Sequence, residues 1–207
     1  MIRTTAIKKT IILALCIVLC IALWFYRYIS FNADIAKTYT PKRTYYSMNE
    51  PVAYDDNIIN LHAYKDCYTC VTKAQIVNYQ DFCAQFGFDE ADELSGAAED
   101  SKICLIEISF SNCGEIAKEF EVGDLLLYGK DKVFYLSPFI ANINPELNLK
   151  ETSAVNIEAG SSKSILMPYV LNSDSFSNKD WSTIEDYTLY LFVTQFPEER
   201  IVCIDYT

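Results

Sequence analysis

Cysteine and histidine are the residues of this chain that could support thiol or metal chemistry. Cys67 and Cys70 form a Cys-x-x-Cys pair, the spacing of thiol oxidoreductases, in which a helix amino terminus stabilises the first thiolate. The β-branched pair Val71-Thr72 follows the motif and disfavours such a helix, and no βαβ pattern surrounds it. We therefore expect a structural role for this pair in preference to a redox role.

Zinc binding is the second chemistry that these residue types allow. His62, Cys67, Cys70 and Cys83 together supply four ligands that zinc accepts. The second pair lacks the close spacing of zinc modules, however, and His62 lies in a strand-like run. We predict no bound metal or other cofactor, and we keep a thiol-redox or zinc-dependent activity centred on Cys67 and Cys70 as the alternative function.

Disulfide bonds are the first hypothesis for the cysteines outside the N-terminal apolar run, because oxidising compartments favour them. The sequence leaves the pairing open, and strand cysteines can also fill a core as free thiols. Cys16 and Cys20 lie inside the apolar run, where we interpret them as small apolar residues. The disulfide candidates are Cys67, Cys70, Cys83, Cys104, Cys113 and Cys203.

The sequence contains few residues that could form other common catalytic motifs. His62 is the one histidine, and no Gly-x-Ser-x-Gly motif surrounds a serine. The glycines are too dispersed for a phosphate-binding loop. We predict that the protein is not an enzyme and that its acidic pairs are solvated charges: Asp55-Asp56, Glu185-Asp186 and Glu198-Glu199.

An uncharged apolar run, Ile11 to Tyr26, precedes all of these residues. With its neighbours it approaches the roughly 20 residues that cross a bilayer. Arg3, Lys8 and Lys9 come before it, and basic flanks tend to remain in the cytoplasm. We predict a cytoplasmic N-terminus at residues 1–9 and a transmembrane helix at 10–29, in a single-pass plasma-membrane protein whose C-terminal part lies outside.

A cleaved secretory signal is the competing interpretation of the same run. Such signals end in small residues, whereas this apolar run continues into Trp24-Phe25-Tyr26. We therefore favour an anchor that is retained, and we expect its aromatic end to lie in the headgroup layer.

The remaining chain should comprise a short irregular stem at residues 30–44 and one extracellular domain at 45–207. After residue 30 the sequence has 13 basic residues against 28 acidic ones, a net charge near −15. This charge disfavours nucleic acid as a partner. The expected partners are the membrane, through the helix, and a protein or cell-envelope component. Tyrosines that could form a binding surface crowd the start of this domain: Tyr45, Tyr46, Tyr54, Tyr64, Tyr68 and Tyr79.

Short segments rich in Val, Ile, Tyr and Phe recur between turn residues and predict β-strands. One segment, Gln75 to Phe86, has the 3.6-residue spacing of an amphipathic helix instead. Many short strands with one buried face each predict two packed sheets, so the fold class is a mainly β sandwich with one short helix. The predicted strands are Asn57–Ala63, Cys104–Ser111, Leu125–Tyr128, Val133–Leu136, Ser164–Val170, Tyr187–Thr194 and Arg200–Tyr206, with turns at 129–132 and 197–200 and an acidic loop at 89–100.

The order of these features resembles a family of membrane- or lipid-anchored, immunoglobulin-like (telokin-like) domains of unknown function on Gram-positive bacterial surfaces. The resemblance implies an immunoglobulin-like antiparallel β-sandwich that serves as a binding or structural module, with no activity attached. The residues that carry it are Met48-Asn49-Glu50-Pro51, Ile103 to Asn112, Phe120 to Tyr135, Ala159-Gly160-Ser161-Ser162 before Lys163 to Val170, and Trp181 with Tyr187 to Val193 and Ile201 to Tyr206.

Overall fold

The computed structural model of the chain divides into two units, residues 1–40 and residues 41–207. It describes residues 2–39, 41–54, 64–88, 100–129, 135–136, 143–144, 154–195 and 197–206. The predicted strand at 57–63, with His62, lies outside the described residues. So do the turn residues 130–132 and residues 89–99 of the acidic loop.

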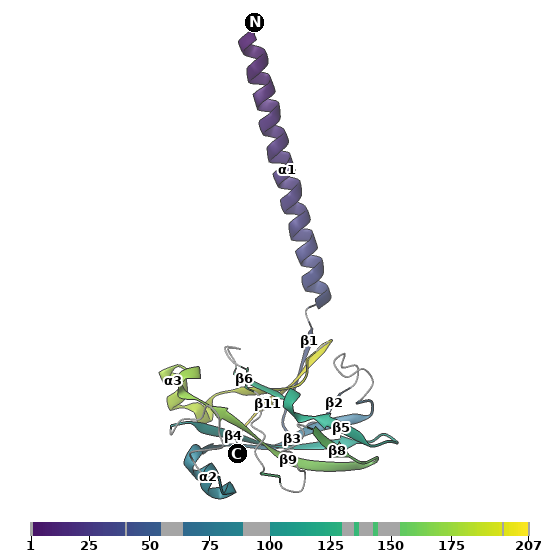
Figure 1. The fold of residues 1–207 in the computed structure, drawn as a ribbon, viewed down its shortest axis with the longest axis vertical. Coiled ribbons are helices and arrows are strands. Elements are labelled where there is room, and N and C mark those ends of the chain that lie inside the picture. The colour runs from purple at the N-terminus through teal and green to yellow at the C-terminus, as the bar shows by residue number, and fades with distance from the viewer. Residues whose placement is uncertain are drawn as a thin grey trace. The chain divides into compact units, whose positions relative to one another are not determined.

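The first unit is a single helix, α1 (Ile2–Tyr39; Figure 1). Within it, Ala14–Ala33 is the one stretch among the described residues that is long and apolar enough to cross a membrane, with mean hydropathy 1.9. A membrane anchor and a signal sequence both have this character. The helix runs through much of the predicted irregular stem and ends before Pro41, since proline disfavours a helical conformation in the residue before it.

The second unit contains a five-stranded sheet in the order β1-β11-β10-β6-β7. Its pairs are antiparallel except that β1, the first strand after the helix, runs parallel to β11, the last strand of the chain. The strands are β1 (Lys42–Tyr46), β6 (Leu126–Gly129), β7 (Tyr135–Leu136), β10 (Leu189–Thr194) and β11 (Glu198–Ile204).

A four-stranded antiparallel sheet, in the order β2-β3-β4-β9, forms the second layer. Its strands are β2 (Val52–Ala53), β3 (Cys67–Asn78), β4 (Lys102–Asn112) and β9 (Ser161–Leu171). The remaining elements are the strand pair β5 (Lys118–Glu121) and β8 (Ala154–Ile157), the helices α2 (Tyr79–Phe86) and α3 (Asn178–Ser182), and the short 3-10 turns Val122–Asp124, Ser173–Ser175 and Ile184–Asp186.

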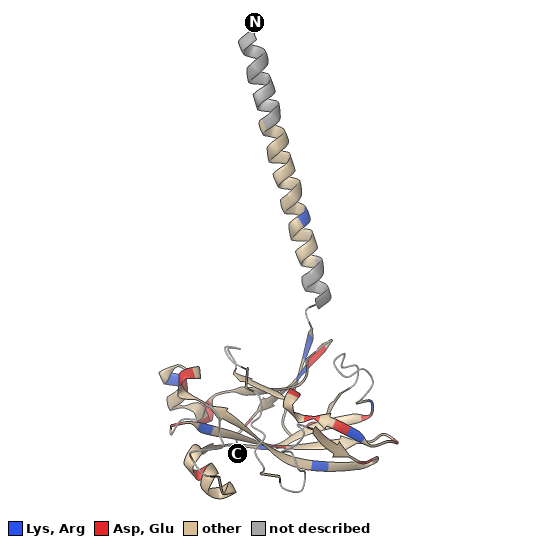
Figure 2. Ribbon diagram, in the orientation of Figure 1, with Lys and Arg blue, Asp and Glu red and all other residues tan. Residues whose placement is uncertain are grey.

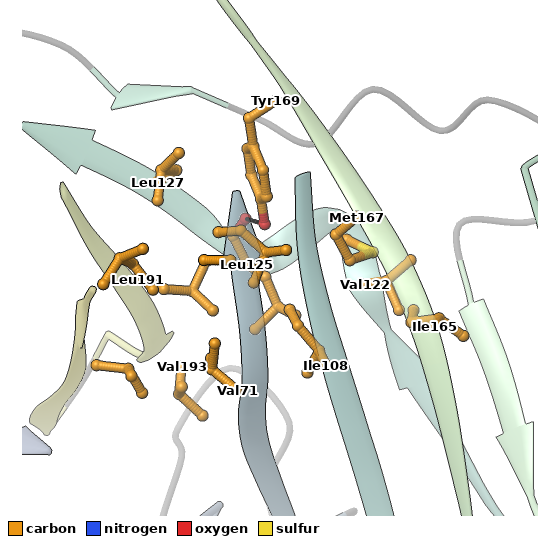
Figure 3. Packing of buried hydrophobic residues seen from close by; sticks show 14 of the residues in the cluster. Val71, Ile108, Val122, Leu125, Leu127, Ile165, Met167, Tyr169, Leu191 and Val193 are labelled. Carbon is orange, nitrogen blue, oxygen red and sulfur yellow. Dashed lines mark hydrogen bonds between the residues drawn. The ribbon is translucent and has the colours of Figure 1, made fainter. Parts of the chain in front are cut away.

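The two larger sheets share one hydrophobic core. Val71 and Ile108 from the four-stranded sheet lie in the same buried cluster as Leu127, Leu191 and Val193 from the five-stranded sheet (Figure 3). Alternate residues of each strand point into this cluster, as the two-residue period of a strand requires. The chain is therefore a mainly β sandwich, as the sequence predicted.

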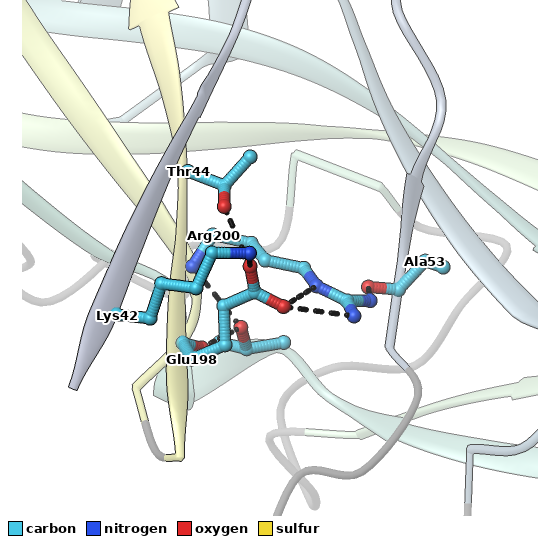
Figure 4. Close-up of polar contacts among 6 residues, drawn as sticks. Lys42, Thr44, Ala53, Glu198 and Arg200 are labelled. Carbon is cyan, nitrogen blue, oxygen red and sulfur yellow. Dashed lines mark hydrogen bonds and ion pairs between the residues drawn. The ribbon is translucent and has the colours of Figure 1, made fainter.

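A polar cluster links the two layers at one edge (Figure 4). Arg200 of β11 donates a hydrogen bond to the backbone carbonyl of Ala53 in β2, which belongs to the other sheet. Its guanidinium also contacts the Glu198 carboxylate, at 3.2 Å from Nη2 to Oε2. The same carboxylate accepts hydrogen bonds from Lys42 and Thr44 of β1. Glu198 therefore holds the first strand of the sandwich to the last.

Five predicted strands are confirmed, with shifted ends, as β4, β6, β9, β10 and β11. The segment 133–136 is a strand at least over Tyr135–Leu136. The predicted turn at 197–200 is wrong from Glu198 on, because β11 begins there. The predicted helix begins only at Tyr79, since Gln75–Asn78 continue β3. The strands that the sequence did not predict are β1, β2, β3, β5 and β8.

Candidate functional site

The Cys-x-x-Cys pair lies at the start of a strand rather than at a helix amino terminus. Both cysteines belong to β3, where residues three positions apart point to opposite faces. Cys67 is fully buried in the core, and Cys70 is half-buried on the outer face. Burial raises the pKa of the Cys70 thiol above its ordinary value. A raised pKa lowers the thiolate fraction, which is the opposite of what redox catalysis needs.

The predicted disulfides are absent, since all eight cysteines are free thiols. Cys83, on the buried side of α2, belongs to a separate cluster from Cys67 and Cys104, which lie in the main core. Cys113 is exposed, and Cys203 is half-buried in β11. Cys67 and Cys104 share the core, but Cys67 lies opposite Asn112 and Cys104 lies opposite Ile76, far apart along β3 and β4. The other cysteines lie in different layers, so the disulfide prediction is corrected. Among the described residues, no group of three or more His, Cys, Asp and Glu side chains could hold a metal ion.

The outer face of the four-stranded sheet owes its composition to an irregularity in β3. Val71 pairs with Ile108 while Lys73 pairs with Glu107, so Thr72 is one extra residue, a β-bulge. Its hydroxyl donates to the Glu107 carbonyl at 3.3 Å. The inward positions of β3 are therefore odd-numbered before the bulge and even-numbered after it, which directs Lys73 outward.

Aligned rows of outward side chains cross this face from β3 through β4 to β9. One row is Cys70, Ser109 and Ser164, and the next is Lys73, Glu107 and Leu166. Rows within a sheet are about 6.6 Å apart, and strands within a row are about 4.8 Å apart. We call the following residues the groove face: Tyr68, Cys70, Lys73, Gln75, Gln85, Leu105, Glu107, Ser109, Ser111, Ser162, Ser164 and Leu166.

A groove with a volume of about 220 Å³ lies at one end of the groove face. Leu166 is half-buried and supplies the apolar surface there, Leu105 is buried at the base of the lining, and the other lining side chains are polar or charged. The charges are one of each sign, because Lys73 and Glu107 are directly opposed on neighbouring strands. The remaining lining residues are Gln75 and Gln85, the latter from α2.

Hydroxyl groups dominate the other end of the groove face. Ser162 and Ser164 are exposed, and Ser109 and Ser111 are half-exposed. The hydroxyls of Ser111 and Ser162 lie 2.7 Å apart and are hydrogen-bonded across β4 and β9. Tyr68 stands beside them with 36% of its surface exposed. This part of the sheet thus presents donors and acceptors to solvent.

Beyond the groove, the same sheet face is covered. Tyr79, Phe82 and Cys83 of α2 pack on Ile103 and Leu105 of β4. The helix ends at Phe86 and is capped by Gly87, whose left-handed conformation (φ 71°) suits glycine. One half of the outer face of the four-stranded sheet is therefore buried by α2. The helix does not cover the groove or the serines of the groove face.

A second cavity, of about 20 Å³, lies among the aromatic side chains of Tyr54, Tyr64 and Phe120. This volume admits about one water molecule. Burial raises the pKa of the Tyr64 hydroxyl and of the neighbouring Asp124 carboxyl. The rings contact one another at centroid distances of 5.1–5.5 Å, so the cluster is part of the core.

The tyrosines that the sequence analysis named as candidates for a binding surface are divided between the core and the surface. Tyr54, Tyr64 and Tyr79 are buried, whereas Tyr45 and Tyr68 are exposed. Of these, Tyr68 belongs to the groove face. Sequence reasoning missed the serines, although polar residues alternate with apolar ones at Glu107, Ser109 and Ser111 within a predicted strand.

Several solved structures are similar to this chain at low sequence identity. A candidate lipoprotein, ycdA, from Bacillus subtilis aligns at 12% identity and TM-score 0.43, over 67% of this chain and 36% of that one. The match thus spans about a third of that longer protein. An uncharacterised β-sandwich protein from Clostridium difficile aligns at 10% identity and TM-score 0.43, over 80% and 96%. A functionally unknown protein from Listeria monocytogenes aligns at 12% and TM-score 0.45, over 69% and 79%.

No curated protein matches this chain. A protein family does match it, over residues 43–200. These residues begin in β1 and end in β11, so the family's domain coincides with nearly all of the sandwich. The chain therefore belongs to the family described as domain of unknown function DUF5028.

Proposed function

We propose that this protein is a binding module held at the outer surface of the plasma membrane of a Gram-positive bacterium by its N-terminal helix. The groove face is the binding surface. The observation that carries the proposal is that one half of this sheet face is covered by α2, while the other half exposes a groove and ordered rows of polar side chains. Such convergent polar groups beside a concavity are typical of binding sites.

The expected topology supports the location of the module. Arg3, Lys8 and Lys9 precede the apolar segment Ala14–Ala33, and basic residues at this position favour a cytoplasmic N-terminus. The sandwich then lies outside. Its strong negative charge keeps it soluble and away from anionic headgroups.

Cys113 provides a direct test of this topology, because its thiol is exposed in the sandwich. Intact cells that express the full chain are treated with a membrane-impermeant maleimide, and the modified peptide is identified by mass spectrometry. We expect modification at Cys113 in intact cells. Modification only after the membrane is permeabilised would disprove the outward orientation, and a product lacking residues 1–33 would identify a cleaved signal instead.

Photo-crosslinking tests the binding surface without assuming the class of partner. The photoreactive residue p-benzoylphenylalanine replaces Tyr68 of the groove face in the full chain in cells. Tyr45 is the matched control, since it is also an exposed strand tyrosine but belongs to the five-stranded sheet. We expect a crosslinked product from position 68 and not from position 45. Equal crosslinking from both positions, or none from 68, would refute the groove face as the binding surface.

A further inference from the structure

We infer that the groove face binds an uncharged, N-acetylated oligosaccharide. This inference rests on the proposed function and specifies the ligand class of the same surface. It depends on the charge of the face, on its hydrogen-bonding groups, on its small apolar surface, and on the protection of the neighbouring sheet edge.

Charge is the first discriminating property of the surface. The chain after residue 30 has a net charge near −15, yet the groove face carries one basic and one acidic residue, Lys73 and Glu107, on adjacent strands. In Figure 2 the strands β4 and β9 are drawn mostly in tan. A polyanion would be repelled by the domain as a whole. A polycation would find no excess of acidic groups on the face itself, which leaves an uncharged ligand as the best match.

The hydrogen-bonding groups suit a ligand that carries many hydroxyls. Serine hydroxyls and glutamine amides both donate and accept, so they can pair with sugar hydroxyls in either direction. Ser109, Ser164 and Gln75 present such groups at strand spacings of about 4.8 Å and row spacings of about 6.6 Å. An extended oligosaccharide could therefore contact several rows in succession.

The apolar surface of the groove is small and lies among amide groups. Leu105 and Leu166 line it beside Gln75 and Gln85. An acetamido substituent has the same composition, one methyl group next to one amide. Its methyl group can contact the half-buried Leu166 while its N–H and C=O pair with a glutamine side chain. Tyr68, at the opposite end of the face, offers an aromatic ring to the C–H face of a sugar.

A protein partner fits this surface less well. Protein interfaces are built around aromatic or arginine anchors and are depleted in serine. Addition of a peptide strand to β9 is also hindered. The side chain of Asn144 already occupies the Leu166 N–H and C=O, and Pro168, two residues further along the same edge, has no N–H to donate.

The test is a calorimetric titration of the full chain in lipid nanodiscs, because sugar-based detergents would compete for the site. The probe is the hexamer of N-acetylglucosamine. The uncharged glucose hexamer, cellohexaose, which carries a hydroxyl in place of each acetamido group, is the matched ligand control. The variant Gln75→Ala removes one amide from the groove, and Gln80→Ala, on the exposed surface of α2, is the matched protein control.

We expect the N-acetylglucosamine hexamer to bind and cellohexaose to bind at least about tenfold more weakly. Gln75→Ala should weaken binding by about fivefold, consistent with the loss of one hydrogen bond, and Gln80→Ala should not. No binding, equal binding of both hexamers, or equal effects of both variants would overturn the inference. If Tyr68 crosslinks to a polypeptide in cells while the hexamer fails to bind, the proposed binding module stands and the saccharide assignment is wrong.

Discussion

The side-chain amide of Asn144 pairs with both backbone groups of Leu166 on the outer edge of β9. Its Nδ2 donates to the Leu166 carbonyl at 2.9 Å, and its Oδ1 accepts from the Leu166 N–H at 3.0 Å. These are the two bonds that a neighbouring strand would make. An exposed strand edge invites pairing with other chains, so this asparagine protects the sheet.

We predict that Asn144→Asp destabilises the sandwich by about 1–3 kcal/mol. The carboxylate can still accept from the Leu166 N–H, but it cannot donate to the carbonyl, and it is buried. Urea unfolding of the full chain measures the change. Asn178→Asp, at an exposed position in α3, is the control and should have almost no effect. Equal stability of both variants would show that the Asn144 pair contributes nothing.

A second buried asparagine closes the turn after β4. Asn112 donates from Nδ2 to the carbonyls of Ile116 and Ile157, at 2.7 and 3.0 Å. Its Oδ1 accepts from the Gly114 N–H at 3.0 Å. We predict that Asn112→Asp costs about 2–3 kcal/mol, because a carboxylate would then face two carbonyl oxygens without a donor. Thermal unfolding should be compared with that of Asn156→Ala, which alters an exposed asparagine of β8.

Glu198 should make the link between β1 and β11 sensitive to acid. Hydrogen bonds from Thr44 and Lys42 are the largest causes that lower its pKa from the ordinary 4.5 to about 2. A carboxylate with a lowered folded-state pKa stabilises the fold fully above its unfolded pKa, and this stabilisation is lost as the pH falls from about 4.5 towards 2.

We therefore predict that Glu198→Gln lowers the free energy of unfolding at pH 7 and has a smaller effect at pH 3. Urea unfolding at both pH values measures the difference in the free energy of unfolding between the unmodified chain and the Glu198→Gln variant. Glu119→Gln, at an exposed position in β5, is the control and should change little at either pH. A Glu198→Gln effect that does not depend on pH would contradict the assigned role of the carboxylate.

Thiol labelling tests the correction of the disulfide prediction. We expect the intact mass of the full chain to be the same with and without reductant, since all eight cysteines are free. In the native protein the exposed Cys113 should react first with a maleimide. Cys70 should react more slowly, because it is half-buried and its pKa is raised. Buried Cys67 and Cys104 should react only in denaturant. A mass that increases on reduction would restore the disulfide hypothesis.

Strand β3 shows why part of the fold could not be predicted from the sequence. The extra residue Thr72 reverses the inward and outward positions in the middle of the strand. Neither half of the strand then shows a long two-residue period. The spacing of apolar residues in Gln75–Asn78 happens to continue the helical spacing of Tyr79, Phe82 and Cys83, so the sequence predicted a helix where β3 continues. A bulge is stabilised by pairing with a neighbouring strand that can be distant in the chain. A local sequence pattern therefore does not predict it.

The sequence by itself determined the apolar segment, the strands with an undisturbed register such as β4 and β9, and hence the sandwich class. These depend on local composition and on which side of a strand is apolar. Tertiary structure alone decided which cysteines share a layer, how Glu198 links the two ends of the domain, and how Lys73, Glu107 and Leu166 form one row. Those relationships join residues far apart in the chain, and the register between strands sets them.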